Sequence, residues 1–326
     1  MDKINWGIIG CGNVTELKSG PAFNKVKNSS LVAVMRRDAA KAKDYALRHH
    51  VPKWYADANQ LINDADVNAI YIATPPSSHE EYTLAAIEAG KPVYVEKPMS
   101  VSYSSAKNMT QAAAKNNVKL VVAHYRREQP LFKKIKELLD EKAIGEVRLI
   151  NLCCHKKPLS MEELADPKIA WRVNTDIAGG GLFNDLAPHQ LDLMIYFFGE
   201  VKEICGLATN QAHLYNADDI VVGNMLFKNE IVFNGSWCFT VDETIEKDTC
   251  EIIGSNGKIS FAVFDHQELT ITGGSRTETI LFEKLIHVQQ PMIEKAVEYF
   301  LDKGYNPCPA EDGAEVMRII EKFNGK

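Results

Sequence analysis

Short apolar runs alternate with helix-like segments along the first 125 residues of the chain. The runs are continuously apolar, as in strands that are buried on both faces. Strands of this kind that are separated by helices form a parallel sheet, and right-handed crossovers make the fold doubly wound. The expected strands are residues 4–9, 31–35, 69–73, 92–95 and 119–123, and the expected helices are residues 39–49, 58–63, 78–89 and 102–116.

A glycine-rich sequence follows the first expected strand and reads Gly10-Cys11-Gly12-Asn13-Val14-Thr15. It resembles the G-x-G-x-x-G pattern, in which the first glycine permits a tight turn and the second lets the backbone approach a pyrophosphate. Thr15 departs from the pattern, because a β-branched residue packs less closely than the usual third glycine. Since the sequence directly follows an apolar strand, it predicts a dinucleotide site. The residues expected to contact the cofactor are Gly10, Gly12, Asn13 and Val14.

Two arginines stand at the end of the second expected strand. NAD-binding domains usually place an acidic residue there, which binds the ribose hydroxyls. This sequence has Arg36 and Arg37 instead. Guanidinium groups bind a 2′-phosphate through paired, charge-assisted hydrogen bonds. We therefore expect the cofactor to be NADP, with NAD as the alternative.

The character of the chain changes after about residue 125. A helix over residues 131–140 and a strand over 147–154 precede strand-like runs, which are separated by turn sequences such as Ser255-Asn256-Gly257. Turns of this kind join antiparallel strands. We expect a Rossmann domain over residues 1–125. Residues 126–326 are expected to form an α+β domain for substrate binding and oligomerisation, with a large, mostly antiparallel open sheet and a C-terminal helix free to pack back on the Rossmann domain. The expected strands are residues 201–209, 219–227, 231–240, 249–254, 258–262 and 269–272, and the expected helices are residues 291–303 and 311–323.

Two groups of polar residues follow strands of the first half. One reads A-T-P-P-S-S-H from Ala73 to His79, and the other is Glu96-Lys97-Pro98. Open α/β sheets bind ligands at the carboxyl ends of their strands, so both groups are candidates for a binding site.

A third group lies in the second half, where GGGLFNDLAPHQLD runs from Gly179 to Asp192. Asp185 and His189 are four residues apart, which puts both on one face of a helix. We expect this helix to begin near Asn184, because Pro188 is tolerated in a first turn. Asp192 extends the same face and could orient the imidazole of His189. A buried core histidine on an amphipathic helix is the alternative interpretation.

The order of these motifs along nearly the whole chain resembles the Gfo/Idh/MocA oxidoreductases. Each motif is weak alone, and together they are specific. The family includes glucose–fructose oxidoreductase, inositol dehydrogenases and 1,5-anhydrofructose reductase. Ala187 stands where the family has a glycine between its aspartate and histidine. The matched motifs are G-x-G, A-T-P-P-x-x-H, E-K-P, Trp171-Arg172 and A-G-G-G-x-x-x-D-x-x-x-H-x-x-D.

The resemblance implies an NADP-linked oxidation or reduction of a sugar, cyclitol or related polyhydroxylated compound. His189 would exchange a proton with the substrate oxygen, Lys97 would stabilise negative charge on it, and Asp185 would orient the substrate. Which of Lys97 and His189 performs the main proton transfer stays open. The resemblance also implies cofactor contacts by Thr74, Pro75, His79, Glu96 and Lys97, and substrate contacts by Lys97, Arg126, Trp171, Arg172, Asp185 and His189, with Tyr125 as a weaker candidate.

Two structural expectations complete this site. The resemblance implies a cis peptide bond before Pro98. Neither half holds a complete acid–base set, so we expect Lys97 and His189 to converge on one substrate atom, in a cleft between the domains.

Composition argues against several other classes of protein. The net charge of −6 disfavours nucleic acid as a partner, since phosphate binding needs a basic surface. No run of about 18 apolar residues predicts a membrane span, and the N-terminus lacks the regions of a signal peptide. Seven cysteines without metal-ligand spacing are typical of a reducing cytoplasm. No cysteine or second histidine joins Asp185, His189 and Asp192 at ligand spacing, so no metal is expected.

Two alternative functions stay open. Some relatives retain NAD(P) through a redox cycle and cleave a glycosidic bond, and a non-catalytic regulator could sense NADP. A regulator would have lost its reactive groups, whereas Lys97, Asp185 and His189 are all present. The expected partner is a small polyol or sugar. Since the exposed face of an open sheet needs a cover, a homodimer or homotetramer through the C-terminal sheet is expected.

Overall fold

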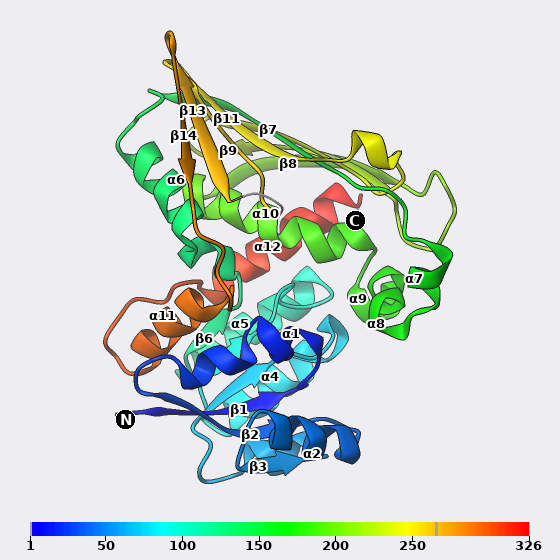
Figure 1. The fold of residues 1–326 in the computed structure, drawn as a ribbon, viewed down its shortest axis with the longest axis vertical. Coiled ribbons are helices and arrows are strands. Elements are labelled where there is room, and N and C mark those ends of the chain that lie inside the picture. Colours follow the sequence, from blue (N-terminus) through cyan, green and yellow to red (C-terminus); the bar gives the residue numbers. More distant parts are fainter. Residues whose placement is uncertain (1, 265–266, 326) are drawn as a thin grey trace. The chain divides into compact units, whose positions relative to one another are not determined.

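The computed structural model describes residues 2–264 and 267–325, which divide into two compact units (Figure 1). Unit 1 comprises Met1–Gln129 and Leu285–Met317, and unit 2 comprises Pro130–Lys284 and Arg318–Lys326. The expected second domain, residues 126–326, is therefore interrupted. Its segment 285–317 returns to unit 1, where Lys119 donates hydrogen bonds to the carbonyls of Tyr299 and Phe300 at 2.8 and 3.2 Å.

Within its described residues, unit 1 holds six parallel strands in the order β3-β2-β1-β4-β5-β6. The strand order reverses between β1 and β4, which is where open α/β sheets bind ligands. The predicted doubly wound parallel sheet is thus confirmed. The strands are β1 (Ile4–Ile9), β2 (Ser29–Met35), β3 (Lys53–Tyr55), β4 (Ala69–Ile72), β5 (Val93–Val95) and β6 (Leu120–Val122).

Side-chain caps fix the N-terminal ends of two helices of unit 1. Asp38 caps α2 by accepting a hydrogen bond from the Lys41 amide, and Ser102 caps α5 through the Ser105 amide. The helices are α1 (Asn13–Leu17), α2 (Ala39–Arg48), α3 (Ala58–Ile62), α4 (His79–Glu88), α5 (Tyr103–Asn116) and α11 (Gln290–Phe300), with the 3₁₀ helices η1 (Gly20–Asn24), η2 (Pro76–Ser78) and η3 (Tyr125–Glu128). Helix α12 (Ala310–Phe323) begins in unit 1 and ends in unit 2.

Aromatic side chains fill the core of unit 1. The centre of the Trp6 ring lies 4.9 Å from that of Phe23 and 5.5 Å from that of Phe300. The centre of the Tyr71 ring lies 5.2 Å from those of Phe23 and Tyr94. Such pairs each contribute about 0.5–1.5 kcal/mol beyond the burial of their area. Phe300 comes from α11, so the returning segment completes this core.

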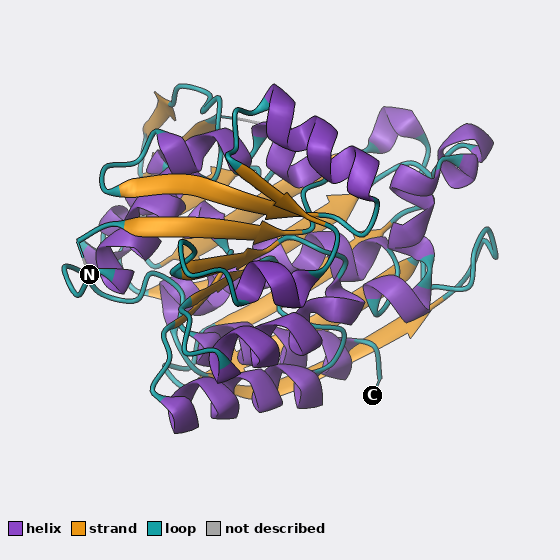
Figure 2. Ribbon diagram, turned by 90° about the horizontal axis from the view of Figure 1, so that it is seen from below, coloured by secondary structure: helices purple, strands orange, loops and turns teal. Residues whose placement is uncertain are grey.

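Within the described part of unit 2, eight strands form one sheet in the order β14-β13-β12-β11-β7-β10-β9-β8. β7 and β10 run parallel and the other neighbours antiparallel, which confirms the predicted open sheet. Figure 2 shows the strands of both sheets in orange. The strands are β7 (Val147–His155), β8 (Val201–Thr209), β9 (Ile220–Phe227), β10 (Val232–Cys238), β11 (Lys247–Gly254), β12 (Lys258–Phe261), β13 (Glu268–Gly273) and β14 (Arg276–Leu281). The helices are α6 (Pro130–Asp140), α7 (Met161–Ala165), α8 (Pro167–Ala170), α9 (Thr175–Ala178) and α10 (Leu182–Phe198), with η4 (Trp171–Val173) and η5 (Glu243–Ile245).

The two faces of this sheet differ in burial. On the inner face Phe233 and Trp237 are fully buried, and Trp237 packs 5.8 Å from the ring of Phe323 at the end of α12. Alternate residues of the strands point outward, and on that face Leu207 of β8 and Val222 of β9 are 66% and 41% exposed. The sheet therefore covers a core on one side and presents apolar side chains on the other. None of the helices in the described residues is long and apolar enough to cross a membrane.

Candidate functional site

The glycine-rich loop of unit 1 contains glycines with two different tasks. Gly10 has a φ of +93°, and a Cβ added there would lie 2.7 Å from the Thr74 side chain, so the turn itself requires glycine. A Cβ added at Gly12 would meet, among the described residues, only the Gly10 carbonyl oxygen at 3.8 Å. Packing within unit 1 therefore does not demand the second glycine. The space in front of it is open to a bound molecule.

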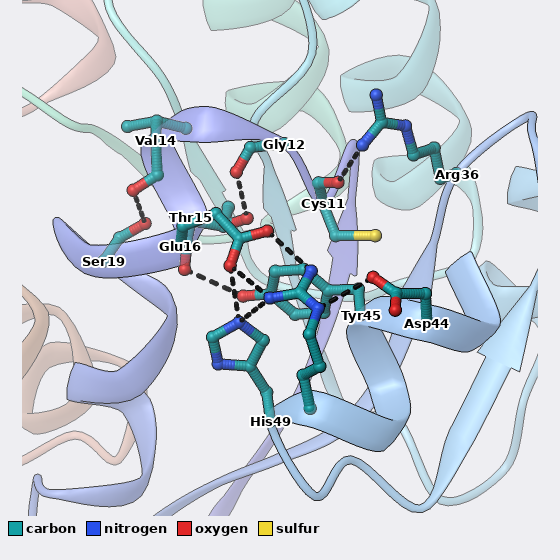
Figure 3. A network of polar contacts seen from close by, with 11 residues as sticks. Cys11, Gly12, Val14, Thr15, Glu16, Ser19, Arg36, Asp44, Tyr45 and His49 are labelled. Carbon is teal, nitrogen blue, oxygen red and sulfur yellow. Dashed lines mark hydrogen bonds and ion pairs between the residues drawn. The ribbon is translucent and has the colours of Figure 1, made fainter. Parts of the chain in front are cut away.

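Thr15 closes the loop on itself in place of the expected third glycine (Figure 3). Its side chain is buried, and its hydroxyl donates to the Gly12 carbonyl at 2.8 Å. Tyr45 of α2 donates its hydroxyl to the Thr15 carbonyl, also at 2.8 Å. A Cβ at Gly20 would lie only 2.1 Å from that carbonyl oxygen. Helix α1 consequently ends after five residues and the chain turns into η1.

An ion-pair network ties α1 to α2 next to this loop (Figure 3). The Glu16 carboxylate accepts hydrogen bonds from both terminal nitrogens of Arg48, at 2.8 and 2.9 Å, and lies 2.7 Å from His49 Nε2. The Arg48 guanidinium lowers the pKa of Glu16 to about 2. The Glu16 side chain is 38% exposed, so solvent screening limits the stabilisation to about 1 kcal/mol or less.

The arginines after β2 remain available to an anion. Arg36 is half-buried and donates to the Cys11 carbonyl at 3.2 Å, which draws its guanidinium over the glycine-rich loop (Figure 3). Arg37 is exposed. The neighbouring acid, Asp38, is engaged as the cap of α2. Backbone and side-chain hydrogen bonds from Lys41 hold the pKa of Asp38 below its usual value.

His79 joins the two polar loops that follow β4 and β5. Its buried ring has Nε2 at 2.8 Å from the Thr74 carbonyl and Nδ1 at 3.0 Å from the Pro98 carbonyl. Burial lowers the pKa of His79. Thr74 and Pro75 are half-buried, and the predicted cis peptide bond between Lys97 and Pro98 is confirmed. His79 therefore fixes the two loops relative to each other.

Glu96 and Lys97 differ in burial although they are adjacent. Lys97 is half-buried, whereas Glu96 is only 6% exposed. The Glu96 carboxylate accepts hydrogen bonds from the Tyr71 hydroxyl at 2.5 Å and the Gln289 amide at 2.6 Å. No motif in the sequence pointed to Tyr71 or Gln289. A tyrosine within the otherwise aliphatic strand β4 is a signal that could have identified the first of them.

In unit 2, helix α10 begins earlier than the sequence predicts. It starts at Leu182 rather than near Asn184, so Pro188 lies inside the helix and not in its first turn. The prediction for Pro188 was wrong because the preceding glycines allow an earlier start. A Cβ at Gly180 would lie 2.3 Å from the Asn184 side chain, and one at Gly181 would lie 2.7 Å from Ala217.

Asp185 lies beside the predicted substrate residues Trp171 and Arg172. Arg172 Nε donates to Asp185 Oδ2 at 3.0 Å, and its Nη1 donates to the Lys168 carbonyl at 2.9 Å. The guanidinium carbon also lies 4.9 Å from the centre of the Trp171 ring. η4 thus holds Arg172 in a fixed position against α10.

His189 follows Asp185 by one helical turn and is 5% exposed. The ring of Phe264 lies edge-on to the imidazole, with 5.8 Å between the ring centres. Asp192 is buried on the next turn of the helix. Arg126 belongs to η3 of unit 1, where its guanidinium lies 5.6 Å from the centre of the Tyr125 ring. Among the residues that the structure describes, no three His, Cys, Asp or Glu side chains gather as a metal site.

Comparison with known proteins gives matches to both halves of the chain. Residues 4–124 match "Oxidoreductase family, NAD-binding Rossmann fold", and residues 132–260 match "GFO/IDH/MocA C-terminal domain". "Oxidoreductase P35" of Formosa agariphila is 47% identical over 99% of both chains. Inositol 2-dehydrogenase of Burkholderia multivorans is 27% identical, over 77% of this chain and 72% of its own. The solved complex of levoglucosan dehydrogenase with NADH and levoglucosan has the same fold, with a TM-score of 0.85 and 22% identity over 98% and 96% of the two chains.

A dinucleotide-binding parallel sheet and an open antiparallel sheet thus define an oxidoreductase of two domains. The chain belongs to the Gfo/Idh/MocA oxidoreductase family. The residues present in unit 1 fit a nicotinamide cofactor, because Gly12 leaves open space and Arg36 lies across the same loop.

Proposed function

We propose that the protein transfers hydride between NADP and a sugar, cyclitol or related polyhydroxylated compound. The observation that carries the proposal is the grouping of Trp171, Arg172, Asp185 and His189 around the first turns of α10. Paired charged and aromatic groups of this kind bind hydroxyl-rich ligands through hydrogen bonds and ring contacts. The names of the relatives agree with this substrate class, since they include inositol 2-dehydrogenase and 1,5-anhydro-D-fructose reductase.

Each catalytic residue has a defined task in this proposal. Bound nicotinamide supplies or accepts the hydride. Asp185, held by Arg172, accepts hydrogen bonds from substrate hydroxyls and orients the reacting carbon. His189 takes the hydroxyl proton during oxidation, and its imidazolium returns a proton during reduction. The Lys97 ammonium stabilises negative charge that develops on the same oxygen.

The proposal includes the coenzyme preference. Arg36 and Arg37 supply cations at the end of β2, and Asp38 is occupied as a helix cap. A 2′-phosphate would gain charge-assisted hydrogen bonds there, whereas the ribose hydroxyls of NAD would lack the usual carboxylate partner.

A coupled assay tests the function directly. Purified protein is assayed for NADPH oxidation with ketoses, inososes and anhydro sugars, and for NADP reduction with cyclitols and aldoses, with NADH and NAD in parallel. Turnover with at least one polyhydroxylated compound supports the proposal. A copurifying nucleotide without net turnover, together with cleavage of a glycoside, would favour a cofactor-retaining glycosidase. Nucleotide binding without any reaction would favour a regulator.

We further propose that the outer face of the unit 2 sheet binds a second copy of the chain. Leu207, Val222 and Val232 are exposed on this face, where the Asn234 side-chain amide also donates one hydrogen bond to Asn151 Oδ1 at 3.2 Å. An apolar sheet face of this kind is stabilised when it is covered. Light scattering of L207K/V222K is expected to show a smaller assembly than the wild type. Leu47→Lys, at an exposed position on α2, is the control.

Location in the cytoplasm stays a prediction of the sequence.

A further inference from the structure

A buried carboxylate belongs to the residue that precedes the predicted catalytic lysine. Within the described residues, three donors hydrogen-bond to Glu96. The Tyr71 hydroxyl and the Gln289 side-chain amide both donate to Oε1, at 2.5 and 2.6 Å. The backbone N–H of Lys97 donates to Oε2 at 3.2 Å. One carboxylate thus connects a side chain of β4 and the side chain of the residue before α11 to the peptide group of Lys97.

The amide of Gln289 is itself held in place. The Tyr94 hydroxyl donates to Gln289 Oε1 at 3.1 Å, which directs the amide nitrogen toward Glu96. The backbone N–H of Gln289 donates to the Lys18 carbonyl at 3.2 Å, and His287 Nδ1 lies 2.7 Å from the Leu17 carbonyl. The returning segment is therefore attached to the end of α1 as well as to Glu96.

The same network reaches the glycine-rich loop from the other side. The Ser19 hydroxyl lies 3.1 Å from the Tyr71 hydroxyl and 3.3 Å from the Val14 carbonyl. Polar contacts run from Val14, in the loop expected to hold the cofactor, to Glu96 beside Lys97.

Burial makes each donor to Glu96 important for the orientation of its carboxylate. A buried carboxylate is unfavourable unless its oxygens accept hydrogen bonds. Loss of one donor is therefore expected to change the orientation of the Glu96 carboxylate. Burial and the adjacent Glu96 carboxylate raise the pKa of Tyr71 well above its usual value. Tyr71 consequently stays protonated and remains a donor throughout the pH range of an assay.

We propose that Tyr71 and Gln289 are positioning residues for Lys97 and act on it through the Glu96 carboxylate. The proposal rests on the proposed function, because it requires Lys97 to take part in the reaction. Both side chains are fully buried, so neither is placed to contact the substrate. Their hydrogen bonds set the orientation of the peptide group that carries the lysine side chain.

Removal of one hydroxyl tests the proposal. Tyr71→Phe deletes a donor to Glu96 and leaves the ring in the core. A misplacement of about 1 Å costs up to about 100-fold in rate, so turnover is expected to fall by up to that factor. Tyr55→Phe is the control, because it removes a tyrosine hydroxyl of the same sheet that donates to a different carboxylate, Asp64, at 2.8 Å. It should retain most of the turnover, and NADP affinity measured by fluorescence titration should change little in either variant.

The reactivity of Lys97 provides a second measurement that needs neither cofactor nor turnover. Each folded variant is treated with limiting acetic anhydride over a range of pH, and acetylation of every lysine is read by mass spectrometry. Tyr71→Phe should change the pH profile of Lys97 acetylation relative to the wild type. The profile of Lys91, six residues away, should stay the same and reports the general state of the fold. Gln289→Leu removes the other donor to Oε1 and should change the profile in the same direction. It replaces Tyr71→Phe in this measurement if that variant does not fold.

The decisive comparison uses a Lys97→Ala background. If Tyr71 acts by positioning the lysine, adding Tyr71→Phe to Lys97→Ala should cost no further turnover. The positioning role would be overturned if Tyr71→Phe lowered turnover by the same factor in Lys97→Ala as in the wild type, or if the acetylation profile of Lys97 were unchanged. Either result would leave the proposed function intact. If Lys97→Ala alone turns over at the wild-type rate, the catalytic role of Lys97 fails, and the inference fails with it.

Discussion

Arg172 and Asp185 form an ion pair between η4 and α10, with Nε of the arginine 3.0 Å from Oδ2 of the carboxylate. Both side chains are partly exposed, at 31% and 21%. The pair therefore contributes little to the stability of the fold. The pair instead fixes the orientation of the Asp185 carboxylate, because the guanidinium that is stacked on Trp171 holds one of its oxygens.

Replacement of Arg172 by lysine is expected to weaken substrate binding rather than folding. Lysine keeps the charge but loses the planar group that stacks on Trp171 and donates to Asp185. We expect the KM of the substrate to rise about tenfold, the equivalent of one hydrogen bond of roughly 1.4 kcal/mol. Steady-state kinetics and a melting curve provide the measurement. Lys168→Ala is the control, because Lys168 contributes its carbonyl and not its side chain to this group. An unchanged KM in Arg172→Lys would contradict the role given to the pair.

The two glycines of the nucleotide loop should respond differently to alanine. Gly10→Ala forces a side chain into a φ of +93° and toward Thr74, so it should lower the melting temperature, at a cost of at least about 1–2 kcal/mol. Gly12→Ala meets no close atom among the described residues and should melt like the wild type. Its methyl group should nevertheless weaken NADP binding in a fluorescence titration. Wild-type affinity in Gly12→Ala would show that the cofactor does not approach this glycine.

The coenzyme preference should depend on Arg36. One charge-assisted contact to a 2′-phosphate is worth roughly 1.5–3 kcal/mol, or about one to two decades in affinity. Arg36→Asp should therefore lose NADP affinity by that factor and bind NAD at least as well as before. Lys43→Asp reverses one charge on the exposed side of α2 and should leave the ratio unchanged. Equal or tighter binding of NAD by the wild type would refute the preference.

Lys97 and His189 should behave as one catalytic unit. Proton transfer by a positioned group contributes about 10²–10⁴-fold, so Lys97→Ala and His189→Ala should each lower turnover by that order with NADP affinity nearly intact. The double variant should lose much less than the product of the single losses. If His189→Ala retains full turnover on the true substrate, His189 is a core histidine and Asp185 loses most of its support.

The Glu16–Arg48 pair gives the fold a pH-dependent contribution. The folded-state pKa of Glu16 is lowered from 4.5 to about 2, so its stabilisation is present above pH 4.5 and is lost as pH falls toward 2. Glu16→Gln should melt slightly below the wild type at pH 7, by an amount that corresponds to less than about 1 kcal/mol. The difference should shrink below pH 4.5 and in high salt. A difference that grows on acidification would contradict the assignment.

Long apolar strands could be predicted from the sequence almost to the residue. β1 and β8 begin and end where the pattern places them, because each combines a continuous or alternating apolar run with clear turn residues. β3 and β14 were missed. β3 reads Lys-Trp-Tyr and β14 is polar along most of its length, so neither has a sustained aliphatic run to detect.

Local motifs identified individual site residues but not their partners. The E-K-P and D-x-x-x-H motifs indicated Lys97 and His189 from neighbours in the sequence. Gln289 could not be found in this way, because it acts 193 residues from Glu96 and depends on the return of the chain to unit 1. Such a contact is set by the tertiary path and leaves no spacing pattern in the sequence.

The return of residues 285–317 to unit 1 also determines when that unit can finish folding during synthesis. A ribosome adds about 5–20 residues per second, so Gln289 emerges roughly 10–40 seconds after Glu96. Throughout that interval the nascent Rossmann sheet lacks α11, and the Glu96 carboxylate lacks one of its donors. The nucleotide-binding unit therefore reaches its final packing only after residues 285–317 have left the ribosome, long after the last strand of its sheet, β6, has been made.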